Sequence, residues 1–112
     1  DDVTSDKAAS HDIIIHGTPV GMYGHSEGES AVPREWLRPG QVVFDMVYRP
    51  RATRLLQDAE AAGCTVIPGL EMLLYQAALQ FELWTEQEAP ETVMRGALVR
   101  ALQPGAAEIK QA

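Results

Sequence analysis

The sequence predicts an α/β fold built on a parallel sheet, and three observations lead to this assignment. Short apolar runs rich in β-branched residues alternate with segments whose apolar positions recur at helical spacing. The connections between the runs are loops or helices, longer than the tight turns that join antiparallel strands. With 112 residues, 46% of them apolar, the chain is long enough to bury one core. We therefore expect one domain of about three strands with flanking helices.

The first half of the chain is predicted to hold two strands separated by a long loop. The run "DIIIHG" (12–17) is β-branched and closes at a glycine, as is typical of a strand buried on both faces. The loop "TPVGMYGHSEGES" (18–30) is long and polar, and such loops in compact domains often carry function. A single helical turn at 33–37 and a turn at 38–41 then lead into a second strand at 42–47.

The second half is predicted to contain the main helices. Apolar residues recur at helical spacing over 52–62, and Gly63 suits the left-handed position that ends many helices. The run "CTVIPG" (64–69) is predicted as the third strand. A longer helix follows it, and after Pro90 a last helix is expected to run to about Leu102.

Charge and composition exclude several function classes. The formal net charge of −7 disfavours binding to nucleic acid or to anionic membranes, and the apolar runs are too short to span a bilayer. The acidic start "DDVTSDKAAS" does not resemble a signal peptide, so a cytoplasmic location is expected. Cys64 is the only cysteine and is interpreted as an inert buried thiol. No metal site is predicted, because the histidines lack the spacing of a helical metal pair: His11, His16 and His25.

Three segments follow the predicted strands and resemble a known family. Ligands of parallel α/β sheets bind beyond the carboxyl ends of the strands. In order and spacing, "DIIIHGTPVGM" (12–22), "VVFDMVYRPRATRLLQDAEAAGC" (42–64) and "VIPGLEMLLYQAALQFELWT" (66–85) resemble the C-terminal part of shikimate dehydrogenase, which reduces 3-dehydroshikimate to shikimate with NADPH. The tail of a bifunctional 3-dehydroquinate dehydratase and shikimate dehydrogenase chain is equally compatible with the resemblance.

The resemblance implies a set of contacts with the cofactor NADP, with NAD as the alternative. Thr18 and Pro19 would line it near the ribose and diphosphate. Met46 would pack near the nicotinamide, Gly69 would approach the nicotinamide amide through its backbone, and Met72 would lie on the same side. These residue types suit a flat ring, which needs a polarisable neighbour and a close backbone approach.

The resemblance also implies contacts with the substrate pair, shikimate and 3-dehydroshikimate. The Tyr48 hydroxyl would face the substrate, and Gln76 would bond one of its hydroxyl groups. A polyhydroxylated ligand needs such directional donors and acceptors. One departure concerns His16, which stands where the family usually has asparagine, so the hydrogen bond of that amide is not carried over.

Several of these residues also have a purely structural interpretation. Met46 alone would count as core, Tyr48 as a bridge between core and solvent, and Gln76 as an amide bonded to a loop carbonyl. Asp45 is not assigned proton transfer, because an acid at the start of a site loop often orients backbone amides. A solvated helix start, with phosphate contact as the alternative, is expected for the arginines Arg49, Arg51 and Arg54.

By the resemblance, the chain is the C-terminal half of a Rossmann-like doubly wound parallel sheet, formed by residues 12–103, with flexible segments at 1–11 and 104–112. No Gly-x-Gly-x-x-Gly fingerprint follows a strand, and no lysine matches the family's catalytic one, so no catalytic residue is assigned. The strand at 12–16 would pair with a strand outside this chain. Its bare edge predicts association, either as a homo-oligomer or with the missing N-terminal part.

Two classes of function remain open at this stage. The first is part of an oxidoreductase, inactive alone, that acts on shikimate with NADP or, as a variant, on quinate or shikimate with NAD. The second is a non-catalytic α/β module used in assembly. The pattern from Asp45 to Tyr48 together with Gln76 favours the first, because an assembly module does not need a hydroxyl and an amide at one crevice.

Overall fold

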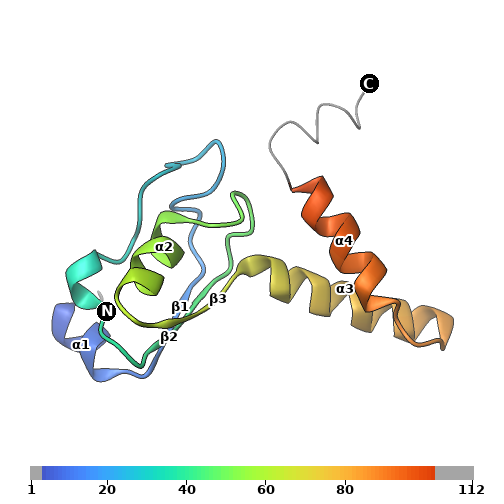
Figure 1. Cartoon of the computed structure of the whole chain (residues 1–112), viewed down its shortest axis with the longest axis horizontal. Helices are drawn as coiled ribbons and strands as arrows, with labels where there is room; N and C mark the ends of the chain where they lie inside the picture. Colours follow the sequence, from blue (N-terminus) through green and yellow to red (C-terminus); the bar gives the residue numbers. More distant parts are fainter. Residues whose placement is uncertain (1–3, 103–112) are drawn as a thin grey trace.

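A computed structural model describes residues 4–102 of the chain (Figure 1). Short strands alternate with helices along the sequence, as the periodicity predicts. The elements in chain order are α1 (Ser5–Ser10), β1 (Ile13–His16), the 3-10 helix η1 (Arg34–Trp36), β2 (Val42–Asp45), α2 (Arg54–Ala61), β3 (Thr65–Ile67), α3 (Gly69–Thr85) and α4 (Glu91–Ala101).

The three strands form one parallel sheet in the order β1-β2-β3, which confirms the predicted parallel arrangement. In the middle of the sheet, Ile14 is opposite Val43, and Val43 is opposite Val66. Each crossover returns the chain to the same end of the sheet, so the three carboxyl ends lie at one edge. That edge is where a ligand site is expected.

The core lies on one face of the sheet, between the strands and α2 (Figure 1). Val43 is fully buried at its centre, and α2 packs Leu55, Leu56 and Ala59 over it. Each large apolar side chain buried in this way stabilises the fold by about 1.5 to 3 kcal/mol. Thr53 starts the helix, because its hydroxyl accepts the Leu56 N–H at 3.3 Å.

The opposite face of the sheet is open, which corrects the expectation that the first strand is buried on both faces. Ile13 and Ile15 are 60% and 63% exposed, and Ile67 on β3 is 38% exposed. Alternate residues of β1 point the other way, so Ile14 packs on the core and His16 is buried. The apolar run predicts burial on two faces, but no described helix covers Ile13 and Ile15.

The N-terminal segment differs from the predicted flexible 1–11. Residues 5–10 form α1, which is capped by Thr4 and buries Ala8. Gln41, buried just before β2, holds this helix through bonds from its amide nitrogen to the carbonyls of Ala8 (2.8 Å) and His11 (2.9 Å). The predicted flexible tail at 104–112 lies outside the described residues.

Helix α3 leaves the end of β3 and extends away from the sheet, and α4 turns back beside it (Figure 1). The predicted apolar stripe is buried only near the sheet, at Leu70 and Leu74. Farther along the helix, Leu83 and Trp84 are 75% and 76% exposed. Among the described residues, no helix has both the length and the apolar character needed to cross a membrane.

Candidate functional site

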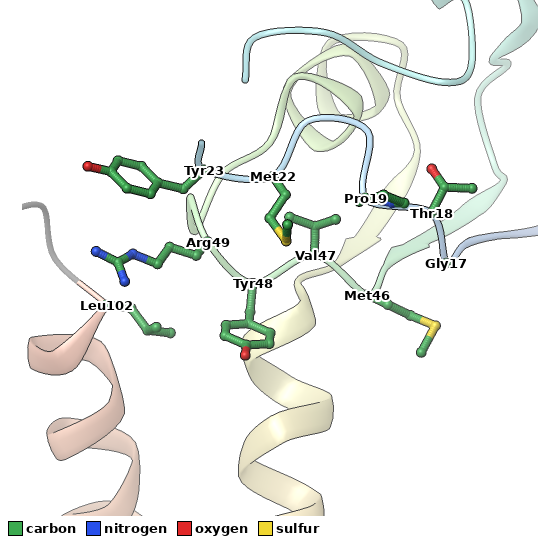
Figure 2. Close-up of a pocket in the computed structure, with 10 residues that line it drawn as sticks. All are labelled: Gly17, Thr18, Pro19, Met22, Tyr23, Met46, Val47, Tyr48, Arg49 and Leu102. Atoms are coloured by element: carbon green, nitrogen blue, oxygen red, sulfur yellow. The ribbon is translucent and has the colours of Figure 1, made fainter. Parts of the chain in front are cut away.

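A pocket of about 480 Å³ opens at the carboxyl ends of β1 and β2 (Figure 2). Its wall is formed by the loop after β1, the segment after β2 and the end of α4. The lining residues are Gly17, Thr18, Pro19, Met22, Tyr23, Met46, Val47, Tyr48, Arg49 and Leu102. This volume is in the range of small-molecule sites, which run from about 300 to 1,000 Å³. The pocket therefore lies where the parallel sheet predicts a ligand.

Four residues predicted from the sequence meet in this pocket: Thr18, Pro19, Met46 and Tyr48. Met46 and Tyr48 follow β2 directly and are 39% and 40% exposed, so their side chains are accessible to a ligand (Figure 2). The Met46 N–H continues the parallel ladder by donating to the His16 carbonyl at 2.9 Å. The segment after β2 is thereby held beside the loop that carries Thr18.

At the end of β2, next to the pocket, Asp45 is fully buried and accepts three hydrogen bonds. One carboxylate oxygen, Oδ1, lies 3.0 Å from His16 Nδ1 and 3.0 Å from the Val47 amide nitrogen. The other, Oδ2, accepts the Thr53 hydroxyl at 2.6 Å. The carboxylate thus ties β1, the segment after β2 and the start of α2 together. The structure gives Asp45 the expected structural role of orienting a backbone amide.

His16 is buried and connects Asp45 with the pocket. Its Nδ1 faces the carboxylate, and its Nε2 contacts the Thr18 hydroxyl. The same hydroxyl oxygen accepts the Val20 N–H at 3.3 Å. The imidazole therefore bonds at both nitrogens and joins the Asp45 carboxylate to a side chain of the pocket.

Tyr23 was not predicted as a site residue, and Arg49 was linked to a ligand only through the alternative of a phosphate contact, yet both line the pocket. The Arg49 guanidinium lies 4.7 Å from the centre of the Tyr23 ring, and the Tyr23 N–H donates to the Arg49 carbonyl at 2.6 Å. Figure 2 shows the two side chains beside each other at one end of the pocket. No local pattern marks this pair, because the partners lie on different loops; the nearest sequence signal is the aromatic residue in the long polar loop.

The remaining three predicted residues, Gly69, Met72 and Gln76, do not line this pocket. Gly69 begins α3 against the backbone: a Cβ there would lie 2.7 Å from the carbonyl oxygens of Met46 and Val47. Met72 is half-buried on α3. Gln76 is exposed, so its amide is not a buried group bonded to a loop carbonyl, which corrects the structural alternative.

Other reactive groups lie outside the pocket. The half-buried Cys64 thiol donates to the Arg38 carbonyl at 3.2 Å, and burial raises its pKa, in agreement with an inert thiol. Arg54 forms an ion pair with Asp58 within α2 at 3.0 Å. Across residues 4–102, no three His, Cys, Asp or Glu side chains gather in a way that could hold a metal ion.

The sheet and the pocket at its carboxyl edge define the class: part of a Rossmann-like α/β domain. Residues 69–99 match the family model described as the Shikimate 5'-dehydrogenase C-terminal domain. The chain is 51% identical over 86 residues to shikimate dehydrogenase (NADP(+)) of Dehalococcoides mccartyi, an alignment that covers 77% of this chain and 30% of that relative. Over the aligned residues, the chain is therefore similar to the C-terminal part of the shikimate dehydrogenases.

Solved structures show the same similarity. Shikimate 5-dehydrogenase from Thermus thermophilus, in complex with NADP(H) and shikimate, matches with a TM-score of 0.79 and 37% identity, over 89% of this chain and 38% of that one. Quinate dehydrogenase from Corynebacterium glutamicum, in complex with NAD, matches with a TM-score of 0.79 and 34% identity, over 85% and 33%. These matches confirm the predicted Rossmann-like fold, and the chain spans about a third of the length of the relatives.

Proposed function

We propose that this chain supplies one wall of the active site of a shikimate dehydrogenase, which reduces 3-dehydroshikimate to shikimate with NADPH. The observation that carries the proposal is the meeting of Thr18, Pro19, Met46 and Tyr48 in one pocket at the carboxyl ends of β1 and β2. Those residues come from two segments far apart in the sequence, and both segments belong to the resemblance with the family. The identity of 51% to a shikimate dehydrogenase supports the same activity.

The lining of the pocket suits a nicotinamide. Met46 presents a polarisable thioether next to Gly17, where a Cβ would lie 3.3 Å from the Met46 sulfur. A flat ring fits against such a surface, while Thr18 and Pro19 would hold the ribose and diphosphate side. The cofactor, when bound, supplies the hydride, and the chain's residues orient it.

Tyr48 would give the substrate a hydroxyl that both donates and accepts. Its side chain is 40% exposed at the pocket, so it is available to a ligand. Met72 and Gln76 would complete the site from α3, Met72 toward the nicotinamide and Gln76 toward a substrate hydroxyl. The exposure of Gln76 supports this role, because its amide is open to a molecule bound between α3 and another part of the protein.

The activity would need protein that this chain does not contain. No catalytic residue is assigned within it, and it spans about a third of its relatives. The open sheet face, with Ile13 and Ile15 exposed, supports association with the N-terminal part of the same protein or with a second copy. A cytoplasmic location fits this role.

Quinate oxidation with NAD is a second candidate. The quinate dehydrogenase from Corynebacterium glutamicum, solved with NAD, matches this chain with the same TM-score, 0.79, as the Thermus shikimate dehydrogenase. Tyr48 and the Gln76 amide suit either polyhydroxylated substrate, so they do not separate the two.

The test is a spectrophotometric assay of the complete protein that contains this chain, beside the 112-residue chain alone. Shikimate and quinate are each supplied with NADP⁺ and with NAD⁺, and nicotinamide reduction is followed in the near ultraviolet. We expect the highest kcat/KM with shikimate and NADP⁺, and no turnover by the short chain. Preference for quinate and NAD⁺ would establish the second candidate. Absence of turnover in all four combinations would reject both and leave a non-catalytic assembly module.

A further inference from the structure

A series of hydrogen-bonded side chains extends from the start of α2 through the core to the pocket. Thr53 donates its hydroxyl hydrogen to Asp45 Oδ2 at 2.6 Å, Asp45 Oδ1 lies 3.0 Å from His16 Nδ1, and His16 Nε2 contacts Thr18 Oγ1. The first three side chains are at most 5% exposed. The last group in this series is the hydroxyl of Thr18, a residue that lines the pocket.

The direction of each bond follows from the chemistry of its partners. Thr53 already accepts the Leu56 N–H, so its hydrogen is free for the carboxylate. Oδ1 of Asp45 also receives the Val47 N–H, and a carboxylate only accepts, so His16 Nδ1 must be the donor. In a neutral imidazole the other nitrogen is then an acceptor. With the imidazole neutral, the hydroxyl of Thr18 donates its hydrogen to His16 Nε2.

This direction determines what Thr18 offers to a ligand. Its hydrogen is held by His16, and one lone pair of its oxygen takes the Val20 N–H. What remains for the pocket is a lone pair. Such an oxygen accepts from a hydroxyl group and has no hydrogen left for a phosphate oxygen.

We propose that His16 is a positioning residue that fixes Thr18 as a hydrogen-bond acceptor for a ribose hydroxyl of the cofactor. This inference rests on the proposed function, and it names the part of the cofactor that Thr18 recognises. An asparagine at position 16 would reproduce only the Nδ1 position, because its amide nitrogen reaches Asp45 while nothing extends to Thr18. The imidazole spans both partners, so the link to Thr18 depends on the histidine of this chain.

The first test is a double-mutant cycle in the complete protein. His16→Asn keeps a donor for Asp45 and removes the acceptor for Thr18, and Thr18→Val removes the hydroxyl. The readout is the dissociation constant of NADP⁺ or NAD⁺, measured by calorimetry. Each single variant should weaken binding by about three- to tenfold. The double variant should lose no more affinity than the more damaging of the two single variants. Thr65→Val, which removes an exposed hydroxyl on β3, is the matched control and should leave the affinity unchanged.

Additive effects of the two substitutions would overturn the inference, because His16 would then act independently of Thr18. Failure of the parent protein to bind either cofactor would overturn it as well. Cofactor binding with the expected coupling but without turnover of shikimate or quinate would reject the proposed function and keep the role of His16. Turnover of shikimate together with additive effects of the two substitutions on cofactor affinity would keep the proposed function and reject the role of His16.

A second measurement does not depend on any variant. The ring nitrogen shifts of His16, read by NMR of the nitrogen-labelled protein at neutral pH, report which nitrogen carries the hydrogen. We expect a protonated Nδ1 and an unprotonated Nε2. A hydrogen on Nε2 would reverse the bond to Thr18 and overturn the inference, even if His16→Asn failed to fold.

Discussion

Arg95 of α4 and Glu71 of α3 are joined by a two-point ion pair. Nη1 of the guanidinium contacts Oε2 of the carboxylate, and Nη2 lies 3.0 Å from Oε1. The side-chain hydrogen bond from Arg95, more than any other influence, lowers the pKa of Glu71 below its ordinary value of 4.5. The pair links the last helix to the helix that leaves the sheet, at a point where both side chains are about two-fifths exposed.

This pair predicts that the packing of α4 on α3 weakens in acid. Because the pKa of Glu71 is lower in the folded state than in the unfolded state, its contribution is present above pH 4.5. That contribution is lost as the pH falls through the lower folded-state pKa. The effect is small because solvent screens the exposed pair.

The measurement is helix content by circular dichroism as the pH is lowered from about 7 to about 3. Glu71→Gln should lower thermal stability slightly at neutral pH and make α4 less sensitive to acid. Glu88→Gln, which removes the charge of an exposed glutamate after α3, is the control and should follow the parent. Identical acid profiles for Glu71→Gln and the parent would show that the pair contributes nothing to the packing.

Gln41 is predicted to hold α1 on the domain. Its amide is fully buried, accepts from the Arg38 N–H at 2.9 Å and donates to two carbonyls at the end of α1. Gln41→Ala leaves those buried groups without partners, so we expect a loss of about 1 to 3 kcal/mol in the free energy of unfolding. Urea titration measures it. Gln57→Ala, which removes an exposed glutamine with one backbone bond, should change stability little; a similar loss there would contradict the role of Gln41.

Gly69 is predicted to be intolerant of any side chain. A Cβ would lie 2.7 to 2.8 Å from three backbone carbonyl oxygens, those of residues 45–47, which cannot move without distorting the pocket wall. We expect Gly69→Ala to destabilise the domain by about 1 to 3 kcal/mol. The matched control is Gly96→Ala in α4, where the nearest atom would be the Arg100 guanidinium at 3.4 Å.

Alanine at position 96 should stabilise α4 by up to about 1 kcal/mol, because glycine is a poor helix former. Thermal unfolding of the two variants therefore separates a packing requirement from general helix propensity. If Gly69→Ala unfolded at the same temperature as the parent, the close contact with the carbonyls would not constrain the chain. The absence of a side chain at position 69 would then matter only because it leaves room for a ligand.

The sequence predicted the strands, the main helices and part of the site, because each has a local signal. Apolar periodicity marks β2 and α2, and the position of Met46 and Tyr48 at the carboxyl end of a predicted strand marks the pocket. The helix α1 was missed because Gln41, about thirty residues farther along the chain, helps to hold it. No local pattern reports such a partner.

The buried network was predicted only in part for the same reason. The role of Asp45 in orienting a backbone amide follows from its place at a strand end, but the bonds to His16 and Thr53 depend on how three segments pack. The open face of the sheet was misjudged for a different reason. Apolar β-branched residues report that a face is to be covered, and they do not report whether the covering element lies in the same chain.

The open sheet face is predicted to make the isolated chain self-associate. Ile13 and Ile15 on β1 point to this face and are more than half exposed. The double substitution Ile13→Lys and Ile15→Lys adds charge to an edge strand, which disfavours pairing between chains. Sedimentation velocity should show a larger species for the parent chain and a monomer for the double variant. Glu60→Lys, at an exposed position of α2, is the control. A monomeric parent chain would refute the prediction.

Tyr48→Phe is predicted to weaken catalysis in the complete protein without weakening the fold. The phenol is 40% exposed and lines the pocket, so the loss of its hydroxyl does not leave a buried group unpaired in the free protein. If the hydroxyl bonds the substrate, kcat/KM for shikimate should fall by an amount equal to about 1 to 3 kcal/mol, while the melting temperature stays the same. Tyr75→Phe removes the hydroxyl of a tyrosine on α3 that is 67% exposed, and it should preserve kcat/KM. Equal kcat/KM values for Tyr48→Phe and the parent would assign Tyr48 to the structural interpretation, as a side chain that bridges core and solvent.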